Sequence, residues 1–120
     1  LLYFVLPQFY GKTLHKLVAF TQHAGLARNI KDHRVTSREM YLNPILSFLY
    51  WKMEYHLTHH MFPTVPSYNL DKLHHHIKNQ LPKPNDGLID AYKEIIPALM
   101  KQKEDTSYFI KKELPEPQNI

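Results

Sequence analysis

Apolar and polar blocks alternate along the 120-residue chain. The first block, LLYFVLPQFYG (residues 1–11), carries no charge, and a helical pattern follows it from Lys12 to about Ala27. Residues 28–39 are polar and rich in turn formers, which predicts a loop. Residues 41–51 are apolar again, but both apolar blocks fall short of the roughly 20 residues that cross a bilayer. They suit buried or interfacial segments, and residues 1–11 equally suit the end of a membrane helix.

Prolines divide the second half of the chain. Pro63 and Pro66 interrupt helical backbone, and Ser67 is a suitable N-cap for a helix that reaches about Asn79. The turn formers LPKPNDG (81–87) end that segment.

An amphipathic helix is predicted from about Leu88 to Lys103, with Pro97 kinking it. Its expected apolar face consists of Leu88, Tyr92, Ile95, Ile96, Leu99 and Met100. The final ELPEPQNI (113–120) is polar and broken by prolines, and we expect it to be loose. Together these patterns predict a mainly α fold.

Composition directs attention to histidine. The chain has nine histidines, no cysteine and a net charge of +4. The lack of cysteine excludes disulfides, zinc–thiolate sites and iron–sulfur clusters. The lysines are scattered among acids without a basic stripe, so nucleic acid is not an expected partner. Beside a membrane, the same excess of positive charge would mark the cytosolic side.

The sequence HLTHH brings three histidines together. On a helix, His56, His59 and His60 occupy positions i, i+3 and i+4, so their imidazoles project from one face. Neutral imidazole is a ligand for iron, copper, nickel and zinc. The spacing favours a metal site over a solvated polar patch. The inverted zinc-protease motif H-x-x-E-H needs a glutamate where this chain has His59, which favours a redox metal over zinc hydrolysis.

Other histidines are weaker candidates. His23, in QHAGL, precedes the polar loop, and that loop offers Asp32, His33 and Arg34 as side chains to orient the ligands. The alternatives are that His23 is a structural histidine and that the three loop residues form a solvated charged turn.

The run His74–His76 cannot share one helix face, because each residue turns the helix by about 100°. Only His74 lies on the stripe of Leu70, Leu73 and Ile77, either as a buried core histidine or directed at the site. We expect His75 and His76 to be exposed.

These motifs resemble a known family. QHAGL, DHR and NPILSFLYWKMEYHLTHHMFPTVPSYNLDKLH are similar to the C-terminal part of the membrane fatty-acid desaturase superfamily, which includes lipid hydroxylases. The last histidine box of that family is H-x-x-H-H, followed by F-P-x-V-P and a Leu–His pair. Here these are residues 56–60, 62–66 and 73–74, and the resemblance covers roughly residues 15–80.

The resemblance implies a helical, integral membrane enzyme with a cytosolic cap that holds two non-haem irons. Such enzymes use dioxygen and an external ferredoxin- or cytochrome-type electron donor to desaturate or hydroxylate an acyl or alkyl chain. By this resemblance the metal ligands are His23, His56, His59 and His60, and no other catalytic residue is assigned. Residues 1–11 would end a membrane or interfacial helix, residues 12–104 would form the cap, and residues 105–120 a polar tail.

Two features depart from the family. Relatives often read N-x-x-Y-H before the last box and N-T-R after the DHR, where this chain has Trp51–Tyr55 and Thr36-Ser37-Arg38. The family's first two boxes, H-x-x-x-H and H-x-x-H-H, are absent, so we expect these residues to be part of a longer enzyme and inactive alone. A non-enzymatic histidine-rich metal-binding module and a zinc hydrolase are the alternative functions.

Overall fold

The computed structural model describes residues 1–116. It is mainly helical, which confirms the predicted fold class, and within this range the extended pairings are two isolated bridges, Leu26 with Ile110 and Met40 with Asn85. The α-helices are α1 (Leu6–Thr21), α2 (His33–Thr36), α3 (Pro44–Leu49), α4 (His56–Met61), α5 (Leu70–Ile77) and α6 (Leu88–Glu104), and the 3-10 turns are η1 (Met53–Tyr55), η2 (Ser67–Asn69) and η3 (Lys78–Gln80).

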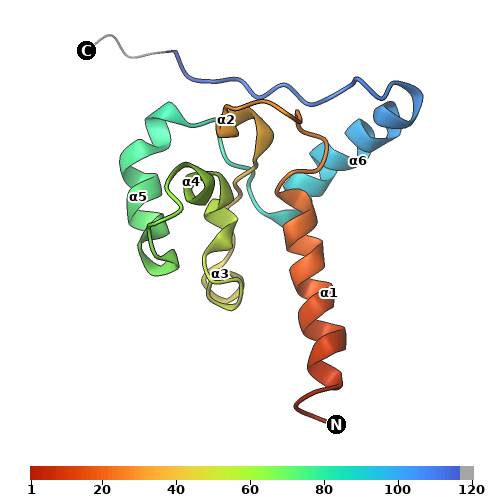
Figure 1. Ribbon diagram of the computed structural model, residues 1–120, viewed down its shortest axis with the longest axis vertical. Helices are drawn as coiled ribbons and strands as arrows, with labels where there is room; N and C mark the ends of the chain where they lie inside the picture. The colour runs from red at the N-terminus through yellow and green to blue at the C-terminus, as the bar shows by residue number, and fades with distance from the viewer. Residues whose placement is uncertain (117–120) are drawn as a thin grey trace.

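Two groups of helices meet beneath the last segment of the chain (Figure 1). The long helix α1 meets α6 at its C-terminal end, and α4 contacts both α2 and α5. The chain after α6 runs back across the molecule above α2. This arrangement brings the end of α1, α2 and α4 to one place.

The hydrophobic core is small and lies where the end of α1 meets α6. Ala24, Met40, Ala91 and Ile95 are buried there. The bounds of α6 match the prediction within one residue, and its predicted apolar face is partly confirmed, because Ile95 is buried and Leu88 and Leu99 pack against the core. Its buried residues are Ala91, Ile95 and Ala98, whereas Ile96 and Met100 are exposed. The two alanines lack bulk, so they allow the neighbouring segments to approach the helix closely.

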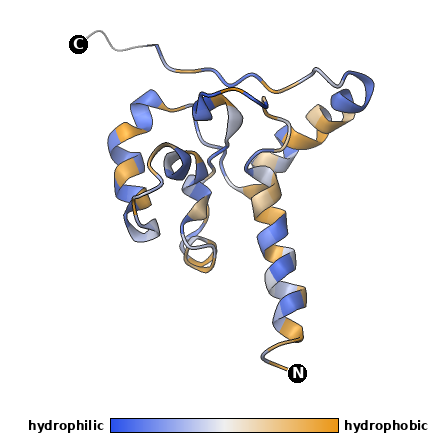
Figure 2. Ribbon diagram, in the orientation of Figure 1, coloured by the Kyte–Doolittle hydropathy of each residue, from blue (hydrophilic) through white to orange (hydrophobic). Residues whose placement is uncertain are grey.

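Helix α1 begins and ends earlier than the predicted Lys12–Ala27 range. Pro7 lies in its first turn, where a missing N–H costs no hydrogen bond. Most apolar side chains of its N-terminal half are exposed, as are several on α3, and Figure 2 shows hydrophobic residues on both helices. No helix within residues 1–116 is both long and apolar enough to cross a membrane.

Two local predictions were wrong. The polar stretch 28–39 contains the one-turn helix α2, which Asp32 caps by accepting a hydrogen bond of 3.0 Å from the backbone N–H of Arg34. Ser67 is the first residue of η2 and caps no helix through its side chain. Pro66 precedes it with extended backbone, so proline geometry starts this turn.

Residues 105–112 are tied to the helices before them. The backbone N–H of Ile110 donates to the carbonyl of Gly25 at 2.7 Å, and Lys112 forms an ion pair of 3.0 Å with Glu94 of α6. Of the stretch 113–120 that was expected to be loose, residues 117–120 lie outside the described range.

Candidate metal centre

A tight turn after α1 presents His23. Gly25 has φ of +74°, a left-handed conformation that glycine adopts without steric cost. A Cβ at this position would approach Ile110 Cδ1 to 3.0 Å. The glycine, two residues after His23, therefore shapes the turn that follows α1 and lets residues 105–112 pack against that turn.

A second reversal places α4. Trp51 and Lys52 have φ of 57° and 56°, and they turn the chain between α3 and η1. The ammonium of Lys52 pairs with Asp71 at 2.7 Å, which links this reversal to α5. Helix α4 then begins at His56, so the histidine box starts with the helix itself.

Three imidazoles from α4 and the α1 turn converge. His56 Nε2 lies 2.9 Å from His60 Nε2 and 2.9 Å from His23 Nε2. All three atoms lie within 4.8 Å of one another. The predicted i, i+4 relationship on α4 thus brings His56 and His60 together, and the fold adds His23.

A backbone contact defines the tautomer of His23. Its Nδ1 lies 2.8 Å from the carbonyl oxygen of Thr36 in α2. A carbonyl only accepts, so Nδ1 carries the proton, and in the neutral ring Nε2 presents a lone pair to the cluster. Metal-binding histidines commonly have this arrangement, in which the second nitrogen donates to a backbone carbonyl.

The cluster also favours unprotonated rings. Burial, together with the neighbouring His60, His23 and His59, lowers the pKa of His56 to about 3, and burial is the largest of these causes. The pKa of His60 is lowered too, first by burial and then by His23 and His33. Metal binding requires neutral imidazole, so these rings are in the ligand form near neutral pH.

The spacing of the nitrogens suits a shared metal ion. Two ligands at right angles, each about 2.1 Å from one ion, lie about 3 Å apart. Without an ion, His56 Nε2 has at most one proton, which can satisfy only one of its two contacts. The Nδ1 atoms of His56 and His59 are buried and lack hydrogen-bond partners within residues 1–116. This donor set fits a metal that accepts imidazole nitrogen.

The other predicted residues lie around this cluster. His59 is outside the group of three, with its ring centroid 6.4 Å from that of His56. The ring of His33 stacks on His60, with centroids 5.2 Å apart. Asp32 and Arg34 pair with each other at 2.8 Å, and this hydrogen-bonded partner lowers the pKa of Asp32. The polar loop therefore contributes one aromatic contact to the cluster and a local ion pair beside it.

A buried carboxylate behind α4 was missed from the sequence. Glu39 Oε1 accepts hydrogen bonds from the backbone N–H and the hydroxyl of Thr58, at 2.8 and 2.5 Å. Its Oε2 lies 2.9 Å from His74 Nδ1, which is close enough for an ion pair, but the angles of this contact are not those of a hydrogen bond. His74 is buried, as was proposed for a core histidine, while His75 and His76 are exposed as expected. The signal available in the sequence was a charged Arg-Glu pair directly before an apolar stretch.

A hollow opens beside the cluster. Its volume is about 670 Å³, and His23, His33 and His60 contribute to its wall. Much of the remaining wall is apolar and comes from Ala19, Phe20, Ala24, Ala27 and Ile30. A second, more apolar cavity of about 500 Å³ lies between α1 and α3, and none of the three clustered histidines lines it.

Comparison with known proteins identifies the family. The sequence model of the fatty acid desaturase family matches residues 1–92, which include all the clustered histidines. The chain belongs to the fatty acid desaturase family. This membership confirms the resemblance read from the histidine box. The family match ends within α6, so residues 105–112 lie beyond it.

One curated relative is much longer than this chain. The chain is 28% identical over 105 residues to the Delta(6)-fatty-acid desaturase fat-3 of Caenorhabditis elegans. That alignment covers 75% of this chain and 24% of the relative, so the chain spans about a quarter of that protein. No solved structure matched the chain.

Proposed function

We propose that this chain contributes part of the metal centre of a membrane oxidoreductase that desaturates or hydroxylates a fatty-acyl or alkyl chain. The observation that carries the proposal is the convergence of three imidazole Nε2 atoms, from His23, His56 and His60. His59, whose buried Nδ1 has no hydrogen-bond partner within residues 1–116, is the fourth proposed ligand. Desaturase family membership supports two non-haem irons as the metal.

The residues around the cluster have distinct roles in this proposal. Iron bound there would supply the dioxygen-dependent oxidation of an unactivated C–H bond, with electrons from a ferredoxin- or cytochrome-type donor. Thr36 holds His23 in the tautomer that offers Nε2, and His33 stacks against His60 and restricts its ring. Phe20 and Ile30 line the adjacent hollow, where they would exclude water and contact a hydrocarbon chain.

A membrane setting follows from the same proposal. Exposed apolar side chains crowd the N-terminal half of α1 and the short helix α3, and exposed contiguous apolar surface marks a lipid or protein contact. The side chains concerned include Phe9, Tyr10, Ile45, Phe48 and Leu49. We place the histidine cluster on the cytosolic side because lysine and arginine, which are enriched on that side of membranes, are frequent in the segments after residues 1–11.

Both alternative functions have weaker support. A zinc hydrolase needs a general base beside the metal, but the ligand group found within residues 1–116 consists of three histidines without a carboxylate. A metal-buffering module would need only the histidine cluster. That function does not explain why the whole stretch of residues 1–92 matches the desaturase family.

The test uses the full-length protein purified from membranes. We expect two irons per chain and oxidation of an acyl substrate that depends on dioxygen and a supplied reductant. The matched control is the exposed His75→Ala variant, which should keep both properties, whereas His56→Ala should lose them. One bound zinc per chain without acyl oxidation would contradict the proposal and support one of the alternatives.

A further inference from the structure

The histidine cluster has two parts, the turn that carries His23 and helix α4, which carries His56 and His60. Two consecutive charged residues, Arg38 and Glu39, are buried between these parts. Their exposed fractions are 1% and 4%, although neither belongs to the group of metal-ligating side chains. Burying a charge is costly unless hydrogen bonds or an ion pair compensate it. The partners of these two side chains therefore indicate why the fold retains them.

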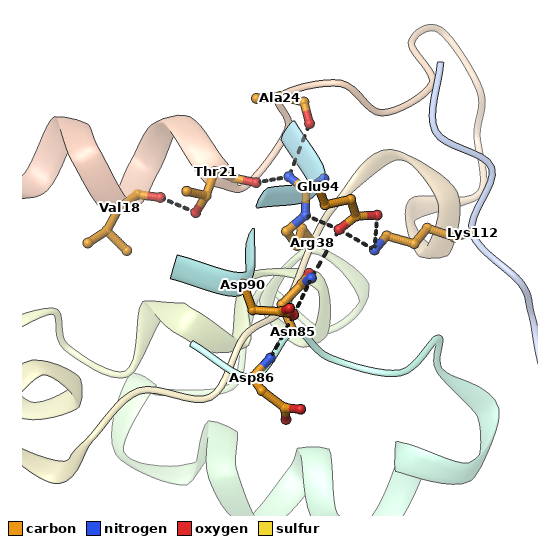
Figure 3. A network of polar contacts seen from close by, with 9 residues as sticks. All are labelled: Val18, Thr21, Ala24, Arg38, Asn85, Asp86, Asp90, Glu94 and Lys112. Atoms are coloured by element: carbon orange, nitrogen blue, oxygen red, sulfur yellow. Dashed lines mark hydrogen bonds and ion pairs between the residues drawn. The ribbon is translucent and has the colours of Figure 1, made fainter. Parts of the chain in front are cut away.

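Arg38 holds the turn that carries His23. Its backbone N–H donates to the carbonyl of Gln22 at 2.7 Å, and its guanidinium donates to the carbonyls of Thr21 and, at 3.0 Å, Ala24 (Figure 3). One residue thus binds three carbonyl groups that lie on both sides of His23. These carbonyls lie at the C-terminal end of α1, where a cation is favoured.

Glu39 holds the helix that carries the other histidines. Its carboxylate binds both the backbone N–H and the hydroxyl of Thr58, which lies between His56 and His59. Thr58 is the third residue of α4, so Glu39 satisfies a free donor of the first turn from outside the helix. The hydrogen bonds of Glu39 therefore restrain the position and rotation of α4.

We propose that Arg38 and Glu39 are positioning residues that hold the two parts of the histidine cluster in register. Their Cα atoms are about 3.8 Å apart, as in any trans dipeptide, so the turn and α4 are both attached to one short rigid piece of chain. That piece is itself fixed, because Asn85 N–H donates to the Glu39 carbonyl at 3.0 Å. This inference rests on the proposed function, since it assigns the cluster to metal binding.

The experiment measures Co²⁺ binding to the metal-stripped full-length protein by visible absorption. Loss of groups that orient a ligand commonly weakens metal binding 10- to 100-fold, so we expect about that loss for Arg38→Met and for Glu39→Leu. Glu39→Gln keeps one carbonyl oxygen for Thr58 and should recover most of the affinity. The controls Lys103→Met and Glu104→Leu change exposed charges on α6 and should leave binding unaltered.

Double mutants separate positioning from general support of the fold. If Arg38 acts through His23, the double mutant Arg38→Met/His23→Ala should bind Co²⁺ less than threefold more weakly than the single variant His23→Ala. The same non-additivity is expected for Glu39→Gln with His56→Ala. Thr58→Val, which removes only the hydroxyl contact, should give a smaller loss than Glu39→Leu and provides a variant with little risk of misfolding.

Two different failures can be told apart. If the wild-type protein binds Co²⁺ through His23 and His56 but Arg38→Met and Glu39→Leu bind it as tightly, the positioning role is wrong and the proposed function stands. Full additivity in both double mutants would also overturn the positioning role. If His23→Ala and His56→Ala bind Co²⁺ as the wild type does, the proposed function and this inference fall together.

Discussion

His56 Nε2 lies 2.9 Å from His23 Nε2, although the two residues are 33 positions apart in the chain. The contact joins the turn after α1 to the first residue of α4. Chemistry at this cluster therefore depends on how accurately two separate segments are held together, and several measurements can examine that dependence.

Alanine substitutions should distinguish ligands from other histidines. Replacing His23, His56 or His60 removes one of the three converging nitrogens, so bound iron and acyl oxidation by the full-length enzyme should both be lost. His59→Ala should also abolish turnover but should retain Co²⁺ binding by the remaining three histidines. His76→Ala, at an exposed position on α5, should change turnover less than about twofold. Full activity in His59→Ala would remove His59 from the ligand set.

The metal-free protein should lose stability on acidification. The pKa of His56 is about 3 in the folded protein and 6.5 ordinarily, so between these values the unfolded chain binds more protons than the folded one. The free energy of unfolding therefore falls as pH decreases through this window. Melting temperatures at pH 7.5 and 5.0 should show the loss, and His56→Leu should reduce it. An equal loss in wild type and His56→Leu would assign the acid sensitivity to other groups.

Two glycines should respond in opposite directions to alanine. Gly25→Ala forces a side chain into left-handed backbone and against Ile110, and it should cost about 1–2 kcal/mol or more. Gly11→Ala adds a methyl group with no heavy atom within 4 Å, inside the exposed part of α1. It should stabilise the protein by up to about 1 kcal/mol. Denaturant midpoints measure both changes, and a neutral Gly25→Ala would show that the turn accommodates a Cβ.

The charged residues around Glu94 of α6 should contribute very unequally to stability (Figure 3). Glu94 lies 3.4 Å from the fully buried guanidinium of Arg38 and 3.0 Å from Lys112. Burial lowers the pKa of Arg38, and Glu94 opposes that effect. Glu94→Ala leaves a buried charge without its carboxylate and should cost about 2–3 kcal/mol, whereas Lys112→Met should cost less than about 1 kcal/mol. Equal losses from the two variants in chemical unfolding would contradict this account.

The sequence alone determined the features that depend on local periodicity. HLTHH places His56 and His60 on one helix face because four residues make about one turn, and the structure has these nitrogens in contact. The same geometry predicted that His75 and His76 would be exposed, and it predicted α6 to within one residue. The histidine box by itself also indicated the family.

Only the tertiary structure decided which distant residues complete the site. The family resemblance named His23 as a candidate ligand, but it reaches the cluster only through the turn at Gly25 and the packing of α1 against α6. By their sequence neighbours alone, Arg38 and Glu39 are predicted to be part of a polar loop. They are buried because their partners, Glu94 and Thr58, come from other helices. The energy of a buried charge depends on such partners in space, so it is fixed only when the whole chain has folded.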